Sequence, residues 1–348
     1  MTVRRELLLF SELPGLRSIP FLPIASAPTP VERITAFPEF GDRVFVKRDD
    51  RASTIYGGNK IRRLELLLAK AADEGARTIV TAGGLASTQV TATILLGRTF
   101  GFDVTAVMFD QPKTDFLREA LAVDLRAGGR LVYGGSYART ARLFVRERAR
   151  AMRPFTILPG AATPLCNLAY VDAMLELAQQ VERGELPRPT RIVVPQGSGG
   201  TVAGIAVGAS LLGWDTVVVG VRITDLAVSN RATIALLVDQ TARLIARSGG
   251  PARRRLTRTR VEVDHRFIGK GYGHATPEAE AGARDVSKVI GAPGEITYSG
   301  KAFAGLRRQV AEHPDDVVLF WATLSSVGRT PTRMAPPDGA PTDIAAFF

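Results

Sequence analysis

One lysine in this sequence of 348 residues stands where covalent chemistry is possible. Lys60 follows the glycine pair Gly57-Gly58 and Asn59, and an amphipathic helix pattern continues after it. With Asn59 as the N-cap, Lys60 would lie in the first helical turn, where the helix dipole disfavours its positive charge. A partly buried lysine there would have a lowered pKa, as an amine that forms Schiff bases requires. The same pattern also fits an ordinary surface lysine beside a turn.

A glycine-rich segment is the second candidate for chemistry. The apolar run 192–195 leads into the sequence Gly-Ser-Gly-Gly-Thr at 197–201, and a helix pattern follows. Backbone N–H groups at such a helix start bind phosphate. The lysine of a Walker loop is absent, and Val202 occupies the place of the third glycine in a dinucleotide fingerprint. We therefore expect a single phosphate rather than a pyrophosphate, with a purely structural glycine turn as the alternative.

Two further groups of polar residues follow the same logic. The loop 83–89 lies between a strand pattern and a helix pattern, so its hydroxyls and free amides could hold a carboxylate or could simply cap the helix. Tyr272 lies between two glycines, and Tyr298 precedes Ser299 and a third glycine. These tyrosines could act on a ligand or could simply be packed.

The elements that must position these residues alternate along the chain. Apolar and β-branched runs predict strands at 44–47, 78–82, 104–108, 131–133, 192–195, 217–222 and 317–321. Helical spacing of apolar residues separates them, for example at 64–71, 116–121 and 170–181. Strands separated by helices predict βαβ units and therefore parallel sheets of an α/β protein.

Composition excludes several classes of protein. The formal charge of +11 comes largely from arginines that concentrate at 139–153 and 247–260. Few aromatic residues accompany them, which favours solvated faces over a nucleic-acid surface. The single Cys166 excludes an intramolecular disulfide, and three scattered histidines predict no metal site. The segment 1–16 is a poor signal peptide and no run of 18 apolar residues occurs, which predicts a soluble cytoplasmic protein without a membrane partner.

Together these segments resemble one family, the pyridoxal-phosphate (PLP) enzymes that comprise 1-aminocyclopropane-1-carboxylate deaminase and D-cysteine desulfhydrase. They belong to the tryptophan synthase β-like group, or fold type II. The resemblance spans about 28–326 through the segments 28–30, 46–50, 57–65, 83–89, 197–204, 271–273 and 298–302. It implies two α/β domains with parallel-rich sheets flanked by helices and the cofactor in the interdomain cleft. The large domain would contain 1–50 plus 167–348, and the small domain 51–166.

The resemblance also implies roles for individual residues. Lys60 would bind PLP as a Schiff base and later move the Cα proton of the substrate. The implied catalytic residues are Lys60, Ser87, Tyr272 and Tyr298. The implied cofactor-binding residues are Asn59, Lys60, Arg63, Thr88, Gly197, Ser198, Gly199, Gly200, Thr201, Thr323 and Leu324. The implied substrate-binding residues are Ser87, Thr88, Gln89 and Ser299.

The sequence departs from the family pattern at two places. Thr88 replaces an asparagine that usually bonds the PLP 3′ oxygen, and Leu324-Ser325 replaces a glycine pair, which would crowd the ring side of the pocket. Ser299 and Thr323 match the desulfhydrase branch better than the deaminase branch. The departures predict a divergent member of the family in which PLP binding survives.

The predicted function is a PLP-dependent lyase or deaminase acting on a small amino acid. We expect β-elimination of a D-cysteine-like substrate to pyruvate and ammonia. The alternatives are ring opening of 1-aminocyclopropane-1-carboxylate, or a diverged PLP reaction on another amino acid. A nicotinamide-dependent oxidoreductase with Asp225 at the ribose, and a nucleic-acid-binding or scaffold protein, are remote alternatives. The family is commonly dimeric, so the resemblance implies a homodimer.

Overall fold

The computed structural model describes residues 6–327 and 336–348. The first five residues of the N-terminal segment considered above as a signal peptide lie outside these ranges. Two compact units make up the described chain. The first unit contains residues 6–66 and 162–327, and the second contains residues 67–161 and 336–348.

The unit boundaries fall at other residues than the sequence predicts. Residues 51–66 group with the first unit, because their backbone is bonded to it: Gly58 N donates to Asp49 O at 2.7 Å. The described C-terminal residues group with the second unit, in which the rings of Phe347 and Tyr133 pack with centroids 5.3 Å apart. The lysine context at 57–60 therefore belongs to the larger unit.

A six-stranded sheet in the order β1-β2-β10-β7-β8-β9 forms the centre of the first unit. Its strands are β1 (Val31–Arg33), β2 (Val44–Lys47), β7 (Arg191–Gln196), β8 (Val217–Arg222), β9 (Val261–Asp264) and β10 (Val318–Trp321). Only β1 pairs antiparallel to its neighbour; the other strands are parallel. The helices of this unit are α1 (Leu8–Glu12), α6 (Pro164–Glu182), α7 (Gly200–Leu212), α8 (Arg231–Arg247), α9 (Pro277–Ile290) and α10 (Ser299–Glu312), with the start of α2 (Asn59–Asp73).

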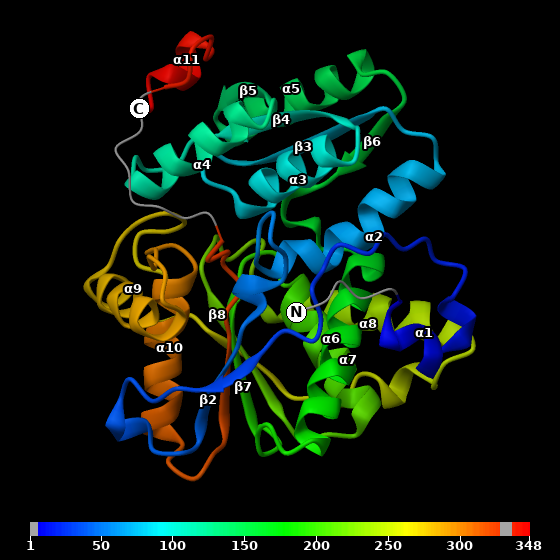
Figure 1. Cartoon of the computed structure of the whole chain (residues 1–348), viewed down its shortest axis with the longest axis vertical. Coiled ribbons are helices and arrows are strands. Elements are labelled where there is room, and N and C mark those ends of the chain that lie inside the picture. Colours follow the sequence, from blue (N-terminus) through cyan, green and yellow to red (C-terminus); the bar gives the residue numbers. More distant parts are fainter. Residues whose placement is uncertain (1–5, 328–335) are drawn as a thin grey trace. The chain divides into compact units, whose positions relative to one another are not determined.

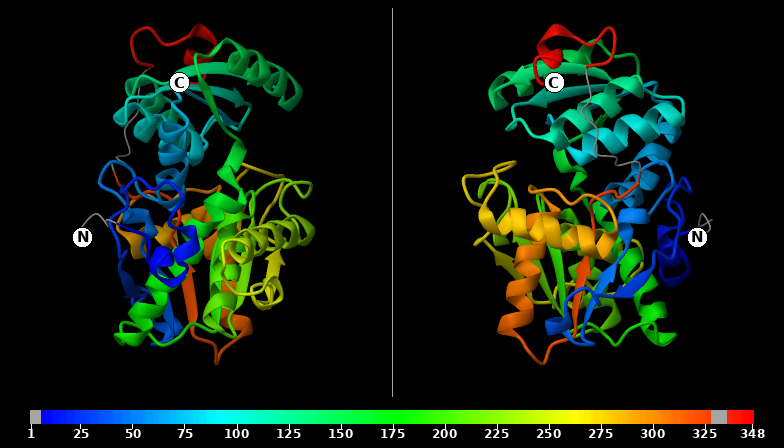
Figure 2. Two further views of the ribbon diagram at one scale, coloured as in Figure 1. Left: turned by 90° about the vertical axis from the view of Figure 1, so that its right-hand side faces the viewer. Right: turned by 60° about the vertical axis from the view of Figure 1, so that its left-hand side comes forward.

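Helices cover both faces of this sheet, as Figures 1 and 2 show, with α6, α7 and α8 on one face and α9 and α10 on the other. Strands β2, β7 and β10 are buried throughout, which explains why each contains a continuous run of apolar residues rather than an alternating pattern. Two glycines let α7 approach α6 closely: a Cβ on Gly204 would lie 2.5 Å from Asn167 O, and one on Gly208 2.6 Å from Met174 Cβ. The approach places α6 beside the start of α7.

The carboxyl ends of the central strands meet at one edge of the sheet. Trp321 of β10 pairs with Lys47 of β2, and Gln196 of β7 pairs with Arg222 of β8. The loops that follow these residues therefore leave the sheet at the same edge, which is where ligands bind in open parallel sheets.

The second unit is built around a parallel four-stranded sheet in the order β5-β4-β3-β6. Its strands are β3 (Thr78–Gly84), β4 (Asp103–Phe109), β5 (Arg130–Gly135) and β6 (Pro154–Ile157). Its helices are the end of α2, α3 (Thr88–Thr99), α4 (Asp115–Arg126), α5 (Tyr137–Arg150) and α11 (Thr342–Ala345). Helices α3 and α4 lie on one side of the sheet and α5 on the other (Figure 1).

All seven predicted strands are present, and β1, β6 and β9 occur in addition. The predicted α/β class with parallel-rich sheets flanked by helices is confirmed. Within the described ranges, each helix falls short of the length or the apolar character that crossing a membrane requires.

Candidate functional site

Lys60 lies in the first turn of α2, at the carboxyl edge of the six-stranded sheet. The helix begins at Asn59, one residue earlier than predicted, so Asn59 is not the N-cap. Among the described residues, none forms a hydrogen bond or ion pair with Lys60 Nζ. Burial lowers the pKa of Lys60 well below its usual range, and the nearby charge of Arg63 lowers it further. A free amine with a lowered pKa is the nucleophile that condenses with a carbonyl group.

The glycine pair before Lys60 fits between two backbone segments. A Cβ on Gly57 would lie 1.8 Å from Asp50 O, and one on Gly58 2.5 Å from Thr323 O. Gly58 also has a φ of +89°, which side-chain-bearing residues rarely adopt. Both glycines are therefore required by close approach, and they fix the backbone from which Lys60 projects.

The glycine-rich loop after β7 runs directly into α7. Gly199 has a φ of +83° and is the N-cap residue of α7, and α7 starts without a side-chain cap hydrogen bond. A Cβ on Gly200 would lie 2.7 Å from the Asn167 side chain and 3.1 Å from Arg63 Nη2. A helix of this length that begins on bare glycine backbone offers several N–H donors to an anion.

Two side chains of α2 converge on the same helix start. Asn59 Nδ2 donates to Thr201 Oγ1 at 3.0 Å, and Arg63 Nη2 donates to the same oxygen at 2.5 Å. Arg63 is only 1% exposed, and burial lowers the pKa of its guanidinium, since the cation has lost its hydration. An anion bound at this helix start would compensate that buried charge. The structure thus brings Asn59, Arg63 and Thr201 together.

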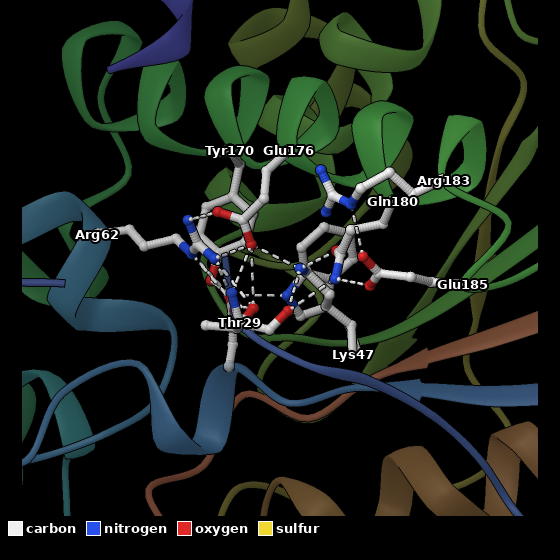
Figure 3. A network of polar contacts seen from close by, with 10 residues as sticks. Thr29, Lys47, Arg62, Tyr170, Glu176, Gln180, Arg183 and Glu185 are labelled. Carbon is white, nitrogen blue, oxygen red and sulfur yellow. Dashed lines mark hydrogen bonds and ion pairs between the residues drawn. The ribbon is translucent and has the colours of Figure 1, made fainter. Parts of the chain in front are cut away.

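A buried ion network holds the first turns of α2 in place (Figure 3). Arg62 donates to Asp49 at 2.9 Å and to Glu176 of α6 at 2.9 Å, while Lys47 Nζ lies 2.6 Å from Glu176. Burial raises the pKa of Glu176, but the charges of Arg62 and Lys47 outweigh burial and hold it below its usual range. Two cations and two carboxylates balance, so this network leaves no charge for a ligand.

The network also receives two aromatic donors that sequence reasoning missed. Tyr170 Oη of α6 and Trp321 Nε1 of β10 each donate to Asp49 Oδ2 at 2.8 Å. The guanidinium of Arg63 lies over the Tyr170 ring at 5.7 Å. Tyr170 therefore links the structural charge network to the candidate anion site.

The two glycine-bracketed tyrosines meet in space. The hydroxyls of Tyr272 and Tyr298 are hydrogen-bonded, and their rings are nearly perpendicular with centroids 5.8 Å apart. Both side chains are half-buried. Tyr298 is set by Glu295, whose carboxylate accepts from the N–H groups of Tyr298 at 2.6 Å and Ser299 at 2.7 Å. Ser299 Oγ bonds back to Glu295 O at 3.0 Å, so the side chain predicted to bind substrate is part of this helix start.

The residues after β10 line the other side of the glycine pair. Leu324 forms a bridge with Gly58, and the Ser325 hydroxyl accepts from Gly57 N at 2.8 Å. Thr323, Leu324 and Ser325 are all buried. The Ser325 hydroxyl, one of the two departures from the family glycine pair, therefore anchors the loop that carries Lys60.

The predicted substrate loop lies in the second unit. Ser87 precedes α3 and makes no side-chain cap hydrogen bond, and Thr88 begins the helix; both are buried. Gln89 Nε2 donates to Thr81 at 2.9 Å and Oε1 accepts from Gly160 N at 3.3 Å. The Gln89 side chain is thus committed to packing within its own unit. Within the described chain, no three His, Cys, Asp or Glu side chains gather as a metal site would require.

Comparison with known proteins identifies relatives over almost the whole chain. A family model described as "Pyridoxal-phosphate dependent enzyme" matches residues 23–323. The D-cysteine desulfhydrase of Salmonella schwarzengrund is 28% identical over 320 residues, which cover 88% of this chain and 94% of the relative. The D-cysteine desulfhydrase of Salmonella paratyphi A is 29% identical over 323 residues with the same coverage.

Solved structures agree with this assignment. A crystal structure of an ACC deaminase homologue superposes with a TM-score of 0.76 and 25% identity, over 92% of this chain and 94% of its own. A fungal L-serine ammonia-lyase from Rhizomucor miehei superposes with a TM-score of 0.59 and 17% identity, over 87% and 95% of the two chains, a likeness of fold alone. The predicted resemblance and the predicted fold type are confirmed.

Proposed function

The chain belongs to the pyridoxal-phosphate dependent enzyme family, and we propose that it uses Lys60 to carry out β-elimination on a small amino acid. The observation that carries this proposal is the unpartnered amine of Lys60, with its lowered pKa, one helical turn from the buried Arg63. The desulfhydrases to which the chain is similar act, by name, on D-cysteine, which makes a D-cysteine-like substrate the first candidate.

The donor set fits a phosphate-bearing cofactor. Arg63, Asn59 and the backbone of residues 197–201 would hold its phosphate, because a buried cation, an amide and an uncapped helix start all favour an anion there. Bound at Lys60, the cofactor would supply an electron sink for the substrate Cα. Thr88 and Leu324 stay proposed neighbours of its ring.

The residues of the chain would supply proton transfer and positioning. The Lys60 amine, neutral because of its lowered pKa, would remove the Cα proton of the substrate. The Tyr272–Tyr298 pair would protonate the leaving sulfur, because the hydrogen bond between the two hydroxyls stabilises the phenolate that results. Ser87 in the second unit is the proposed partner of the substrate carboxylate.

The proposed reaction balances with water as the only co-reactant. The Cα–H and Cβ–S bonds of D-cysteine break, sulfide leaves, and a carbon–carbon double bond forms. Water then releases pyruvate and ammonia, so one cysteine and one water give pyruvate, ammonia and hydrogen sulfide. The substrate itself supplies both electrons of the leaving sulfide, and the reaction needs no oxidant.

Two lysines of α2 provide the test. Lys60→Ala should abolish the visible absorbance band of the purified enzyme and pyruvate release, while Lys70→Ala, at an exposed position of the same helix, should leave both unchanged. Borohydride reduction followed by peptide mapping should place the cofactor on residue 60. Lys47 and Lys301 are also buried and also have a lowered pKa, so a label on either of them would overturn the assignment.

The substrate class is tested with a panel of amino acids. Pyruvate from D-cysteine or D-serine supports β-elimination. The similarity to an ACC deaminase homologue makes ring opening the second candidate, and 2-oxobutyrate from 1-aminocyclopropane-1-carboxylate would support it. A labelled Lys60 with no product from D-cysteine, D-serine, their L forms or the cyclopropane substrate would refute both and leave a diverged reaction.

We also propose that the enzyme is a cytoplasmic homodimer that uses neither nucleic acid nor membrane as a partner. These proposals rest on the family resemblance. Light scattering with size-exclusion chromatography measures the mass directly, and a mass of about 37 kDa, that of one chain, would refute the dimer.

A further inference from the structure

Lys301 is a buried lysine that the proposed reaction does not use. It lies in the first turn of α10, and its side chain is 0% exposed. Its Nζ donates to Ile268 O at 2.8 Å and to Gly271 O at 2.9 Å. A buried ammonium needs acceptors, and here both recorded acceptors are backbone carbonyls of a single loop.

That loop carries Tyr272. Its own backbone hydrogen bonds are long, from Gly271 N to Ile268 O at 3.3 Å and from His274 N to Gly271 O at 3.4 Å, and Arg266 at its start donates to Glu312 of α10 at 3.0 Å. The loop connects β9 to α9 without regular secondary structure, and it contains three glycines with positive φ: Gly269 at +58°, Gly271 at +135° and Gly273 at +78°. Glycine adopts many backbone conformations, so these residues by themselves do not fix the conformation of the loop. Bonds that close the loop on α10 therefore determine where its side chains point.

The other tyrosine of the pair is fixed at the start of the same helix. Tyr298 is the N-cap residue of α10, three residues before Lys301, and the Glu295 carboxylate holds its backbone N–H at 2.6 Å. Tyr298 and Lys301 thus occupy one helical turn, and the Tyr272 loop is attached to that turn twice. One attachment is the Lys301 ammonium and the other is the hydroxyl contact between the tyrosines.

The charges around Lys301 are consistent with an ammonium that holds the Tyr272 loop by hydrogen bonds rather than with a reactive amine. Burial lowers the pKa of Lys301, the charge of Glu295 acts in the opposite direction and that of Arg222 at the end of β8 adds to burial, so that the pKa is about 8. Unlike Lys60, Lys301 has its Nζ hydrogen-bonded to two carbonyl oxygens, which favour the ammonium form, and an ammonium has no lone pair with which to attack a substrate.

We propose that Lys301 is a positioning residue that holds the loop 268–271 on α10, so that the Tyr272 hydroxyl meets Tyr298 at the reacting centre. The inference rests on the proposed function, in which this tyrosine pair protonates the leaving group. Lys301 touches neither substrate nor cofactor, and its effect passes through Tyr272.

A double-mutant cycle on the full-length holoenzyme tests the coupling. Lys301→Met should lower kcat about 10- to 100-fold, as expected for loss of hydrogen bonds from a charged donor, with KM and the absorbance band nearly unchanged. In a Tyr272→Phe background the same change should cost less than about 3-fold, because the group it positions is gone. An equal loss in both backgrounds would overturn the proposal. Lys288→Met, at an exposed lysine of α9, is the matched control and should have no effect.

A second measurement does not depend on the reaction. The chain has six tyrosines, so 3-fluorotyrosine labelling gives six ¹⁹F resonances that single Tyr→Phe variants assign. Lys301→Met, or Lys301→Gln if the first variant does not fold, should move the resonances of Tyr272 and Tyr298 and leave Tyr170 in place. If the Tyr272 and Tyr298 resonances do not move, Lys301 does not position the tyrosine pair and the proposal is refuted. If these resonances move while the wild-type enzyme has no lyase activity, the positioning role of Lys301 is supported and the proposed function is refuted.

Discussion

The stability of the second unit should fall as pH rises, because of one buried carboxyl group. Asp124 on α4 is fully buried, and neither of its carboxyl oxygens has a hydrogen-bond partner among the described residues. Burial raises its pKa from 3.8 to about 8; the Thr91 hydroxyl on α3 acts in the opposite direction without reaching hydrogen-bonding geometry. Asp124 is therefore mostly protonated in the folded protein at neutral pH.

The sign and size of the effect of pH on the free energy of unfolding follow from the pKa of Asp124 in the folded and in the unfolded protein. Between about pH 4 and pH 8 the folded state binds this proton and the unfolded state does not, so stability present at low pH is lost as pH rises. Each pH unit in that window costs about 1.4 kcal/mol. Up to pH 7 the window spans about three units, which gives a cost of about 4 kcal/mol as an upper value.

Asp124→Asn removes the titration while keeping the size of the neutral acid. We expect the variant to be more stable at pH 7 by about 2 to 4 kcal/mol, and its advantage over the wild type to grow by about 3 kcal/mol from pH 5 to pH 7. Urea unfolding followed by circular dichroism at several pH values measures both. Asp115→Asn, at an exposed position of the same helix, is the control and should change stability little. A stability difference that does not vary with pH would refute the reasoning.

Other perturbations test the first unit. Glu176→Gln leaves Lys47 and Arg62 buried with a single carboxylate, so we expect a loss of about 3 to 5 kcal/mol in unfolding free energy, read from denaturant midpoints; a loss below 1 kcal/mol would contradict it. Thr201→Val removes the hydroxyl that accepts from two α2 side chains, so the Kd for pyridoxal phosphate should rise about tenfold in a fluorescence titration. An unchanged Kd would count against the proposed phosphate site. Gly58→Ala should lower the Tm strongly and Gly75→Ala only mildly. Both glycines have positive φ, but only at Gly58 would the added Cβ meet a backbone oxygen. Equal losses of Tm would show that this steric clash does not matter.

Local patterns predicted the parts of the fold that are locally determined. Strands β2, β7, β8 and β10 are apolar runs, and buried parallel strands have that signature. Strand β6 begins at Pro154, just after an arginine-rich helix, and β9 follows the arginines up to residue 260, so neither has the apolar run that predicts a strand. Strand β1 has only three residues, too few for a period to be recognised.

In the candidate site, too, sequence patterns indicate residues that are adjacent in the sequence and miss contacts between residues far apart in it. Lys60 and the glycine loop were predicted because glycines, a helix start and a lysine are adjacent in sequence. The Arg62–Glu176 pair joins residues 114 positions apart, and nothing local to either indicates the other. Glu295 was also missed, since a carboxylate that caps a helix from four residues before it resembles any surface acid until the loop is folded.

The adjacent arginines of α2 have opposite consequences for the protein in the cell. Arg62 pairs with two carboxylates, whereas burial lowers the pKa of Arg63, so an anionic ligand beside Arg63 would stabilise the folded chain. A ligand that binds only the folded state at 100 times its Kd adds about 2.7 kcal/mol to stability. The vitamin-derived cofactor then acts as a folding ligand, and the amount of this enzyme that survives proteolysis should follow the supply of that vitamin.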